Sequence, residues 1–196
     1  MNSNLKVIFF VLIMGMITSG LILGMDVLTY ERIQENELAE TKSTILDAYG
    51  VSYTFSNIHD VFEENVETVE VGYEGESYTF YIDKTTQAIS YEFLGNGLWG
   101  PISGIITLNS TFDTIERITV LVQQETPGLG GIVAERSFLD QFPGVKMIPE
   151  LLIVKDSSPN QGNEVDSITG ATGTSTAFMN LLNASYQAHK NAWDNR

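Results

Sequence analysis

Hydroxyl side chains are concentrated in one short segment near the carboxyl end of the chain. Residues 166–176, with the sequence DSITGATGTST, hold six Ser or Thr residues and two glycines directly before a stretch with helical spacing. Hydroxyl groups and backbone amides at the start of a helix can cap that helix, and they can also bind a phosphate at its positive end. Capping is the commoner use, but Gly170 and Gly173 would let a bulky ligand approach the backbone closely. The segment is therefore either a helix cap or a phosphate site.

Two glycine-rich segments lie further upstream. Residues 95–100 (GNGLWG) fit the pattern G-x-G-x-x-G, which binds dinucleotides when a helix follows it. Pro101 and the β-branched residues after it predict a strand, so we interpret this segment as a turn between strands. The turn presents Leu98 and Trp99 either at the mouth of a binding site or to the core. Residues 125–131 (ETPGLGG) predict a second, Pro-Gly turn.

The three segments together resemble motifs of the FMN-binding subunits of the Nqr and Rnf respiratory complexes. The signature D-x-x-[ST]-G-A-T of that family matches residues 166–172, its E-T-P-G-L-G turn matches residues 125–130, and a G-x-G-L-W turn of its Nqr branch matches residues 95–99. The resemblance covers nearly the whole chain and implies that FMN is held by a phosphoester to Thr172. The other residues that it implies for the FMN site are Asp166, Thr169, Gly170, Ala171, Glu125, Thr126, Leu129, Leu98 and Trp99.

The resemblance also implies how the cofactor arrives and what it does. In that family a separate flavin transferase, of the ApbE type, uses FAD and magnesium to esterify the last threonine of the signature. We therefore expect covalent FMN as the cofactor of a one-electron carrier, a redox subunit that is not catalytic on its own. The implied partners are the other membrane subunits of an NADH:quinone or ferredoxin:NAD oxidoreductase that moves Na⁺ or H⁺. The turn at residues 95–99 favours the NqrC type, whereas the short chain favours the RnfG type.

Two other functions remain open from the sequence. The chain could be a stand-alone, membrane-anchored FMN-binding module that serves another extracytoplasmic reductase. It could also be a structural anchored domain in which the threonine segment only caps a helix. The absence of bound flavin after co-expression with a transferase would favour the structural reading.

Composition excludes several other classes of function. The chain has no cysteine, which removes disulfides, thiolate zinc sites and cysteine-held iron-sulfur clusters. After Lys6, the remainder carries 9 basic and 25 acidic residues, and this formal charge of −16 makes binding to nucleic acid a poor interpretation. His59 and His189 are far apart and lack metal-ligand spacing. We expect no metal site and no catalytic triad.

The first residues predict a membrane anchor. Residues 7–25 contain no charged side chain and are long enough to cross a bilayer as a helix. A cleaved signal peptide is the main alternative, but no A-x-A site follows. We assign residues 1–26 to a cytoplasmic amino terminus and a transmembrane helix, residues 27–50 to a helical stalk, and residues 51–196 to an extracytoplasmic FMN-binding domain. The weak positive-inside signal of Lys6 gives this orientation in a bacterial plasma membrane.

The remaining pattern predicts the elements that must position the motifs. Five alternating or β-branched runs, separated by turn residues, predict a mostly antiparallel sheet over residues 68–73, 77–82, 88–93, 102–108 and 115–122. A short strand is expected at residues 151–154. Helices are expected at residues 58–64, 134–142 and 174–193. The class is α+β, with a single transmembrane helix before one domain of sheet and flanking helices.

Overall fold

The computed structural model describes residues 3–155 and 160–196. Its amino-terminal helix α1 runs without interruption from Ser3 to Ala48. Among the described residues, α1 is the one helix long and apolar enough to cross a membrane. The expected anchor and stalk thus fall in a single helix, and the boundary between them stays a prediction. Met1 and Asn2, which belong to the expected cytoplasmic terminus, lie outside the described residues.

The folded unit extends from Lys42 to Arg196 and begins with the last turns of α1. Ile45 and Leu46 are fully buried there. The helix ends as the glycine after it predicts, because Gly50 adopts a φ of +69° and the N–H of Val51 donates to the carbonyl of Leu46 at 3.0 Å. The phenolic O–H of Tyr49 donates to the carbonyl of Tyr81 at 2.6 Å. These contacts connect the end of α1 to the sheet.

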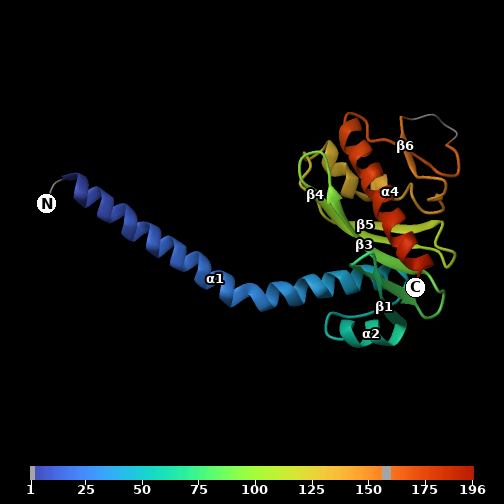
Figure 1. The fold of residues 1–196 in the computed structure, drawn as a ribbon, viewed down its shortest axis with the longest axis horizontal. Helices are drawn as coiled ribbons and strands as arrows, with labels where there is room; N and C mark the ends of the chain where they lie inside the picture. Colours follow the sequence, from blue (N-terminus) through green and yellow to red (C-terminus); the bar gives the residue numbers. More distant parts are fainter. Residues whose placement is uncertain (1–2, 156–159) are drawn as a thin grey trace. The chain divides into compact units, whose positions relative to one another are not determined.

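The predicted antiparallel sheet is confirmed, with its strands in sequential order (Figure 1). They are β1 (Val66–Tyr73), β2 (Glu76–Asp83), β3 (Ile89–Asn96), β4 (Pro101–Leu108) and β5 (Ile115–Val122). The strands β3 and β4 pair along their whole length, from Ile89 opposite Leu108 to Asn96 opposite Pro101. The GNGLWG segment is therefore the connection between two paired strands, and the strand that follows it rules out a dinucleotide-binding helix there.

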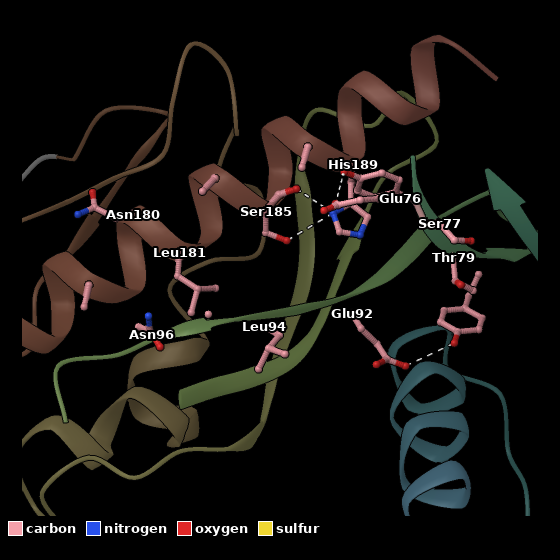
Figure 2. Close-up of a pocket in the computed structure, with 16 residues that line it drawn as sticks. Glu76, Ser77, Thr79, Glu92, Leu94, Asn96, Asn180, Leu181, Ser185 and His189 are labelled. Carbon is pink, nitrogen blue, oxygen red and sulfur yellow. Dashed lines mark hydrogen bonds between the residues drawn. The ribbon is translucent and has the colours of Figure 1, made fainter. Parts of the chain in front are cut away.

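The strands β2 and β3 pair at only two positions and then diverge. Tyr81 lies opposite Ser90 and Ile82 opposite Ile89, but no pairing is formed between the rest of the two strands. A groove of about 1010 Å³ opens between β2, β3 and the last helix, α4 (Thr172–Asp194) (Figure 2). The helix lines it with small residues such as Ala177 and Ala184.

The helix α4 confirms the predicted carboxyl-terminal helix and covers the core of the sheet (Figure 1). Its buried residues recur at helical spacing, as in Phe178, Leu181 and Leu182. The ring of Phe178 is fully buried and contacts the rings of Phe93, Phe138 and Phe142 at centroid distances of 6.0, 6.2 and 6.1 Å. Aromatic edge contacts of this kind fix α4 against both the sheet and the segment after β5.

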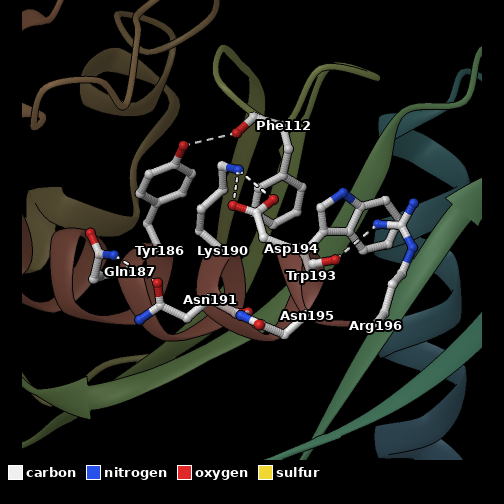
Figure 3. A network of polar contacts seen from close by, with 9 residues as sticks. All are labelled: Phe112, Tyr186, Gln187, Lys190, Asn191, Trp193, Asp194, Asn195 and Arg196. Carbon is white, nitrogen blue, oxygen red and sulfur yellow. Dashed lines mark hydrogen bonds and ion pairs between the residues drawn. The ribbon is translucent and has the colours of Figure 1, made fainter.

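Polar contacts hold the carboxyl-terminal end of α4 (Figure 3). The phenolic O–H of Tyr186 donates to the carbonyl of Phe112 at 2.9 Å, and Lys190 pairs with Asp194 one helical turn later. The Trp193 ring stacks on Phe112, with centroids 5.6 Å apart. The end of α4 is therefore anchored to the turn between β4 and β5, which fixes the axis of the helix that begins at Thr172.

The segment after β5 differs from its prediction. A single helix over residues 134–142 is wrong: a 3₁₀ helix η1 (Gly130–Ala134) is followed by a short helix α3 (Arg136–Leu139). Glu135, between them, is extended, with φ −85° and ψ 145°. Pro143 disfavours helical geometry at the residue before it, which limits α3 at its carboxyl end. The other short elements are α2 (Ile58–Asn65), as predicted, and the parallel strands β6 (Leu152–Val154) and β7 (Glu164–Asp166), of which β7 was not predicted.

His189 packs inside the folded unit and should make stability depend on pH. Its ring stacks on Tyr91 with centroids 3.9 Å apart, and its Nδ1–H donates to the carbonyl of Ser185 at 2.8 Å. Burial lowers the pKa of His189 from its ordinary value, and the Ser185 hydrogen bond opposes this change only in part. As the pH decreases, the unfolded chain therefore binds the His189 proton before the folded chain does. The free energy of unfolding is not reduced by this residue above a pH of about 6.5, and it falls as the pH decreases below that value.

We expect His189→Phe to remove most of the decrease in melting temperature between pH 7.5 and 5.5. Thermal unfolding at the two pH values measures it. His59→Phe is the matched control, because His59 is exposed and contacts only Lys42 among its described hydrogen-bond partners. A His189→Phe variant as pH-sensitive as the unsubstituted protein would contradict this role of the partly buried ring.

Candidate functional site

Thr172 is the first residue of α4 and is exposed. Its hydroxyl makes no hydrogen bond to any residue within 3–155 or 160–196. The helix-cap interpretation does not apply to it, because the N-cap position is occupied by Ala171 and no side chain caps the helix. The first N–H groups of a helix lack intrahelical partners and favour a negative group. Thr172 thus offers a free hydroxyl beside uncapped backbone amides.

The hydroxyl-rich segment divides into structural and free residues. Thr174 and Ser175 are buried. The Ser175 hydroxyl donates to the carbonyl of Ala171 at 3.1 Å and accepts the N–H of Ile168 at 3.0 Å, which tightens the turn before α4. Thr169 and Thr172 remain exposed. Thr174 and Ser175 therefore shape the start of the helix, whereas Thr169 and Thr172 are accessible at the surface.

Two glycines leave room on either side of Thr172. A Cβ at Gly173 would lie 3.0 Å from Leu98 Cδ2, and one at Gly170 would lie 3.4 Å from Leu129 Cδ2. Gly170 also adopts a φ of +80°, which L side chains rarely adopt. The two turns found in the sequence thus lie against the threonine segment: Leu98 approaches it from the β3–β4 connection and Leu129 from the turn after β5.

The two turns that lie against the threonine segment carry exposed apolar side chains. Leu98 is 53% exposed, Trp99 71% and Leu129 46%. The interpretation of Leu98 and Trp99 as core residues is therefore wrong. Large apolar side chains gathered at the surface typically mark a binding surface. A flat aromatic ring system fits this cluster better than a small polar ligand does.

Glu125 lies beneath this cluster with only 4% of its surface exposed. Its Oε1 accepts the backbone N–H groups of Leu98 and Trp99 at 2.8 and 3.0 Å. Its Oε2 accepts the hydroxyl of Thr174 at 2.6 Å. The sequence pointed to Glu125 as part of the flavin site but showed no sign of its partner, since Thr174 is separated from it by 49 residues.

The remaining candidates are placed differently. Thr126 has an exposed side chain, and its carbonyl accepts the N–H groups of Leu129 and Gly131 at 3.2 and 2.9 Å, which closes the turn. Ala171 is buried and offers only its backbone to a ligand. Asp166 ends β7, where its Oδ1 accepts the Asn160 amide at 3.1 Å. None of its described hydrogen bonds reaches residues 169–172, and its part in a flavin site stays a prediction.

The groove of Figure 2 is not the site of these residues. Neither Thr172 nor any of Leu98, Trp99 and Leu129 lines it. Thr172 and these three apolar side chains are instead exposed at the surface.

Comparisons with known proteins agree with this arrangement. Residues 97–187 match the FMN-binding domain family, and the matched region contains Leu98, Trp99, the turn at residues 125–131 and the threonine segment. The chain is 41% identical over 95 residues to the C subunit of the Na(+)-translocating NADH-quinone reductase of Vibrio alginolyticus, covering 45% of this chain and 37% of that protein. It is 38% identical over 98 residues to the G subunit of the Na(+)-translocating ferredoxin:NAD(+) oxidoreductase complex of Acetobacterium woodii, covering 47% of each. The matches thus span less than half the length of these curated relatives.

Solved structures share the fold. The crystal structure of the C subunit of the Na(+)-translocating NADH-quinone reductase from Parabacteroides distasonis matches with a TM-score of 0.67 and 26% identity, covering 78% of this chain and 90% of that one. Shewanella oneidensis NqrC has the same TM-score at 17% identity, covering 75% of this chain and 90% of that one, and supports the α+β fold alone. The matching domain, the curated relatives and the shared fold together support the placement of this chain with the FMN-binding subunits of the NqrC and RnfG type.

Proposed function

We propose that this chain is an electron-transfer subunit that carries FMN as a phosphoester on Thr172. The observation that carries the proposal is the free, exposed hydroxyl of Thr172 at the uncapped start of α4, with Leu98 and Leu129 against the glycines on either side of it. A phosphate esterified there would lie beside backbone N–H groups that favour negative charge. The exposed apolar side chains next to it would cover an aromatic ring system.

Attachment needs a separate enzyme. A threonine hydroxyl is a poor nucleophile near neutral pH, and no described hydrogen bond links Thr172 to a base. A flavin transferase would have to supply the activation, with FAD as donor. The Thr172 oxygen would form a bond to the FMN phosphorus, the pyrophosphate bond of FAD would break, AMP would leave, and the hydroxyl would lose its proton. The exposure of Thr172 supports access by such an enzyme.

The protein would position and shield the cofactor. FMN, when bound, supplies reversible uptake and release of electrons. Leu98, Trp99 and Leu129 would contact its apolar surface, while the backbone around Gly170 and Ala171 would lie close to the phosphate. Thr126 and Thr169 are exposed and remain proposed contacts, as does Asp166.

Intact mass of the full chain, co-expressed with a flavin transferase, tests the proposal. We expect an increase equal to FMN less water, and peptide mapping should assign it to Thr172. If Thr172 stays unmodified although the same transferase modifies an established substrate in parallel, the electron-carrier proposal must be withdrawn.

Trp99→Ala should change the flavin without detaching it. Trp99 is exposed and adjacent to Leu98, and its backbone rather than its ring is held by Glu125. We expect full covalent attachment but a shifted visible absorption spectrum or midpoint potential, because a ring contact contributes to the flavin environment. Leu94→Ala is the control: Leu94 is 75% exposed but lines the groove away from Thr172. Unchanged spectrum and potential in Trp99→Ala would place the ring outside the flavin site.

The names of the relatives support a place in a larger complex. Those proteins are subunits of Na(+)-translocating oxidoreductases. We infer that this chain sits in a bacterial plasma membrane through α1, with its amino terminus cytoplasmic and its domain outside, among the membrane subunits of an Nqr- or Rnf-type complex that moves Na⁺ or H⁺. Protease added to right-side-out vesicles should cleave the domain; protection from it would reverse the orientation.

A stand-alone FMN module on the membrane is the alternative, and the short match to the curated relatives favours testing it. Affinity purification of the chain from mildly solubilised membranes should recover several polytopic subunits in fixed proportion. Recovery of the flavinylated chain alone would favour the stand-alone module.

A further inference from the structure

The Glu125 carboxylate connects all three segments that surround Thr172. Its two oxygens accept three hydrogen bonds: two from the amides of Leu98 and Trp99, and one from the Thr174 hydroxyl. Thr174 lies two residues after Thr172 in the first turn of α4. Glu125 itself begins the turn that carries Leu129. One side chain thus links the β3–β4 connection, the turn after β5 and the start of α4.

The surrounding glycines make room for this carboxylate. A Cβ at Gly97 would lie 2.4 Å from Glu125 Oε1, and one at Gly130 would lie 2.8 Å from Oε2 and 2.5 Å from Thr174 Oγ1. Any side chain at either position would displace the carboxylate. Gly97 and Gly130 belong to the two turns identified in the sequence, so both turns are built around Glu125.

The hydrogen-bond geometry leaves Glu125 little capacity to bind a ligand. All three partners donate, so both oxygens act as acceptors, as in an ionised carboxylate. Burying a carboxylate costs free energy unless it is well hydrogen-bonded, and bonds to a charged acceptor are stronger than neutral ones. The three hydrogen bonds offset this cost and hold backbone amides in place, with almost no surface left for flavin contact.

We propose that Glu125 is a positioning residue that holds the Leu98–Trp99 connection against the start of α4 before flavin is attached. Only the part of this inference that concerns flavin rests on the proposed function. Without the carboxylate, the connection between β3 and β4 would lose its attachment to Thr174 in α4, and the backbone of Leu98 and Trp99 would no longer be fixed against the start of that helix.

Three variants of the full chain test separately whether Glu125 holds the β3–β4 connection and whether this affects the bound flavin. Glu125→Ala removes all three bonds. Glu125→Gln retains an oxygen for the two amides, while its N–H can donate to the Thr174 oxygen. Thr174→Val removes only the bond to Oε2. Amide hydrogen exchange of the flavin-free chain measures whether the β3–β4 connection is held in place. Visible absorption and fluorescence anisotropy measure the environment and mobility of the attached flavin.

In the flavin-free chain, we expect the Leu98 and Trp99 amides to exchange at least about ten-fold faster in Glu125→Ala than in the unsubstituted protein. Glu125→Gln and Thr174→Val should stay close to the unsubstituted rates. Core amides of β4 report whether each variant is folded. If Glu125→Ala does not fold, the unsubstituted protein still tests the proposal. Exchange of the Leu98 and Trp99 amides at the rate of unprotected amides would then overturn it.

In the flavinylated chain, Glu125→Ala should lower the anisotropy and shift the spectrum, and Glu125→Gln should restore both. A Glu125→Ala variant with released amides but an unchanged flavin would overturn the proposed role. Failure of the proposed function would give a different result, because Thr172 in the unsubstituted protein would then carry no FMN. Hydrogen exchange in the flavin-free chain would still decide whether Glu125 holds the connection.

Discussion

Thr172→Ala is expected to abolish covalent FMN completely while leaving the fold intact. The hydroxyl is the attachment point in the proposed function, and alanine has no side-chain oxygen to form the ester bond. Because Thr172 is exposed and its hydroxyl makes no described hydrogen bond, its loss should change the free energy of unfolding by no more than about 1 kcal/mol. Intact mass after co-expression with the transferase and thermal unfolding of the flavin-free chain measure the two effects.

Thr176→Ala provides the matched control for this result. Thr176 lies one turn later on α4 and is also exposed, but it is not the threonine of the proposed attachment. It should therefore be modified as fully as the unsubstituted chain. FMN on a Thr172→Ala chain, at any residue, would contradict the assignment of the attachment point. A large loss of stability in that variant would instead mean that Thr172 belongs to the structure of the helix start.

The regular parts of the fold could be predicted because their signals are local. The alternation in residues 102–108 and 115–122 corresponds to strands β4 and β5, and the helical spacing after residue 174 corresponds to α4. The segment 134–142 was predicted less well. Of the helix expected there, only α3 forms, because Glu135 is extended before it and Pro143 limits it at its carboxyl end. Such breaks depend on a few backbone angles rather than on periodicity.

The candidate site was predictable as motifs but not as geometry. The sequence identified Thr172 and the two turns by their residues, yet it left Trp99 between a core and a surface position. Only the three-dimensional arrangement decides this, because exposure depends on what lies against the turn. The separation of the Glu125 and Thr174 side chains along the chain likewise hides their hydrogen bond of 2.6 Å. Hydroxyl residues that shape the helix start cannot be told from a free one by type alone.

Phe178→Ala is expected to give the largest loss of stability among these variants. The ring is fully buried between β3 and the short helix α3, in contact with Phe93, Phe138 and Phe142. Removing a buried aromatic ring costs about 3–5 kcal/mol, since transfer energy and contacts are both lost. For a folded unit of this size, the melting temperature should fall by about 6–20 °C. Thermal unfolding of the full chain in detergent, followed by circular dichroism, measures it.

The effect of Phe178→Ala should remain separate from the chemistry at Thr172. The ring holds the middle of α4, whereas the start of the helix is fixed by Ser175 and Glu125, so the folded fraction should still accept FMN. Phe55→Ala is the control for the loss of a ring as such: Phe55 is 82% exposed, and its replacement should change stability by no more than about 0.5 kcal/mol. Equal melting temperatures for the two variants would show that α4 does not depend on this aromatic cluster, and the position of Thr172 would then have to be maintained by the helix start alone.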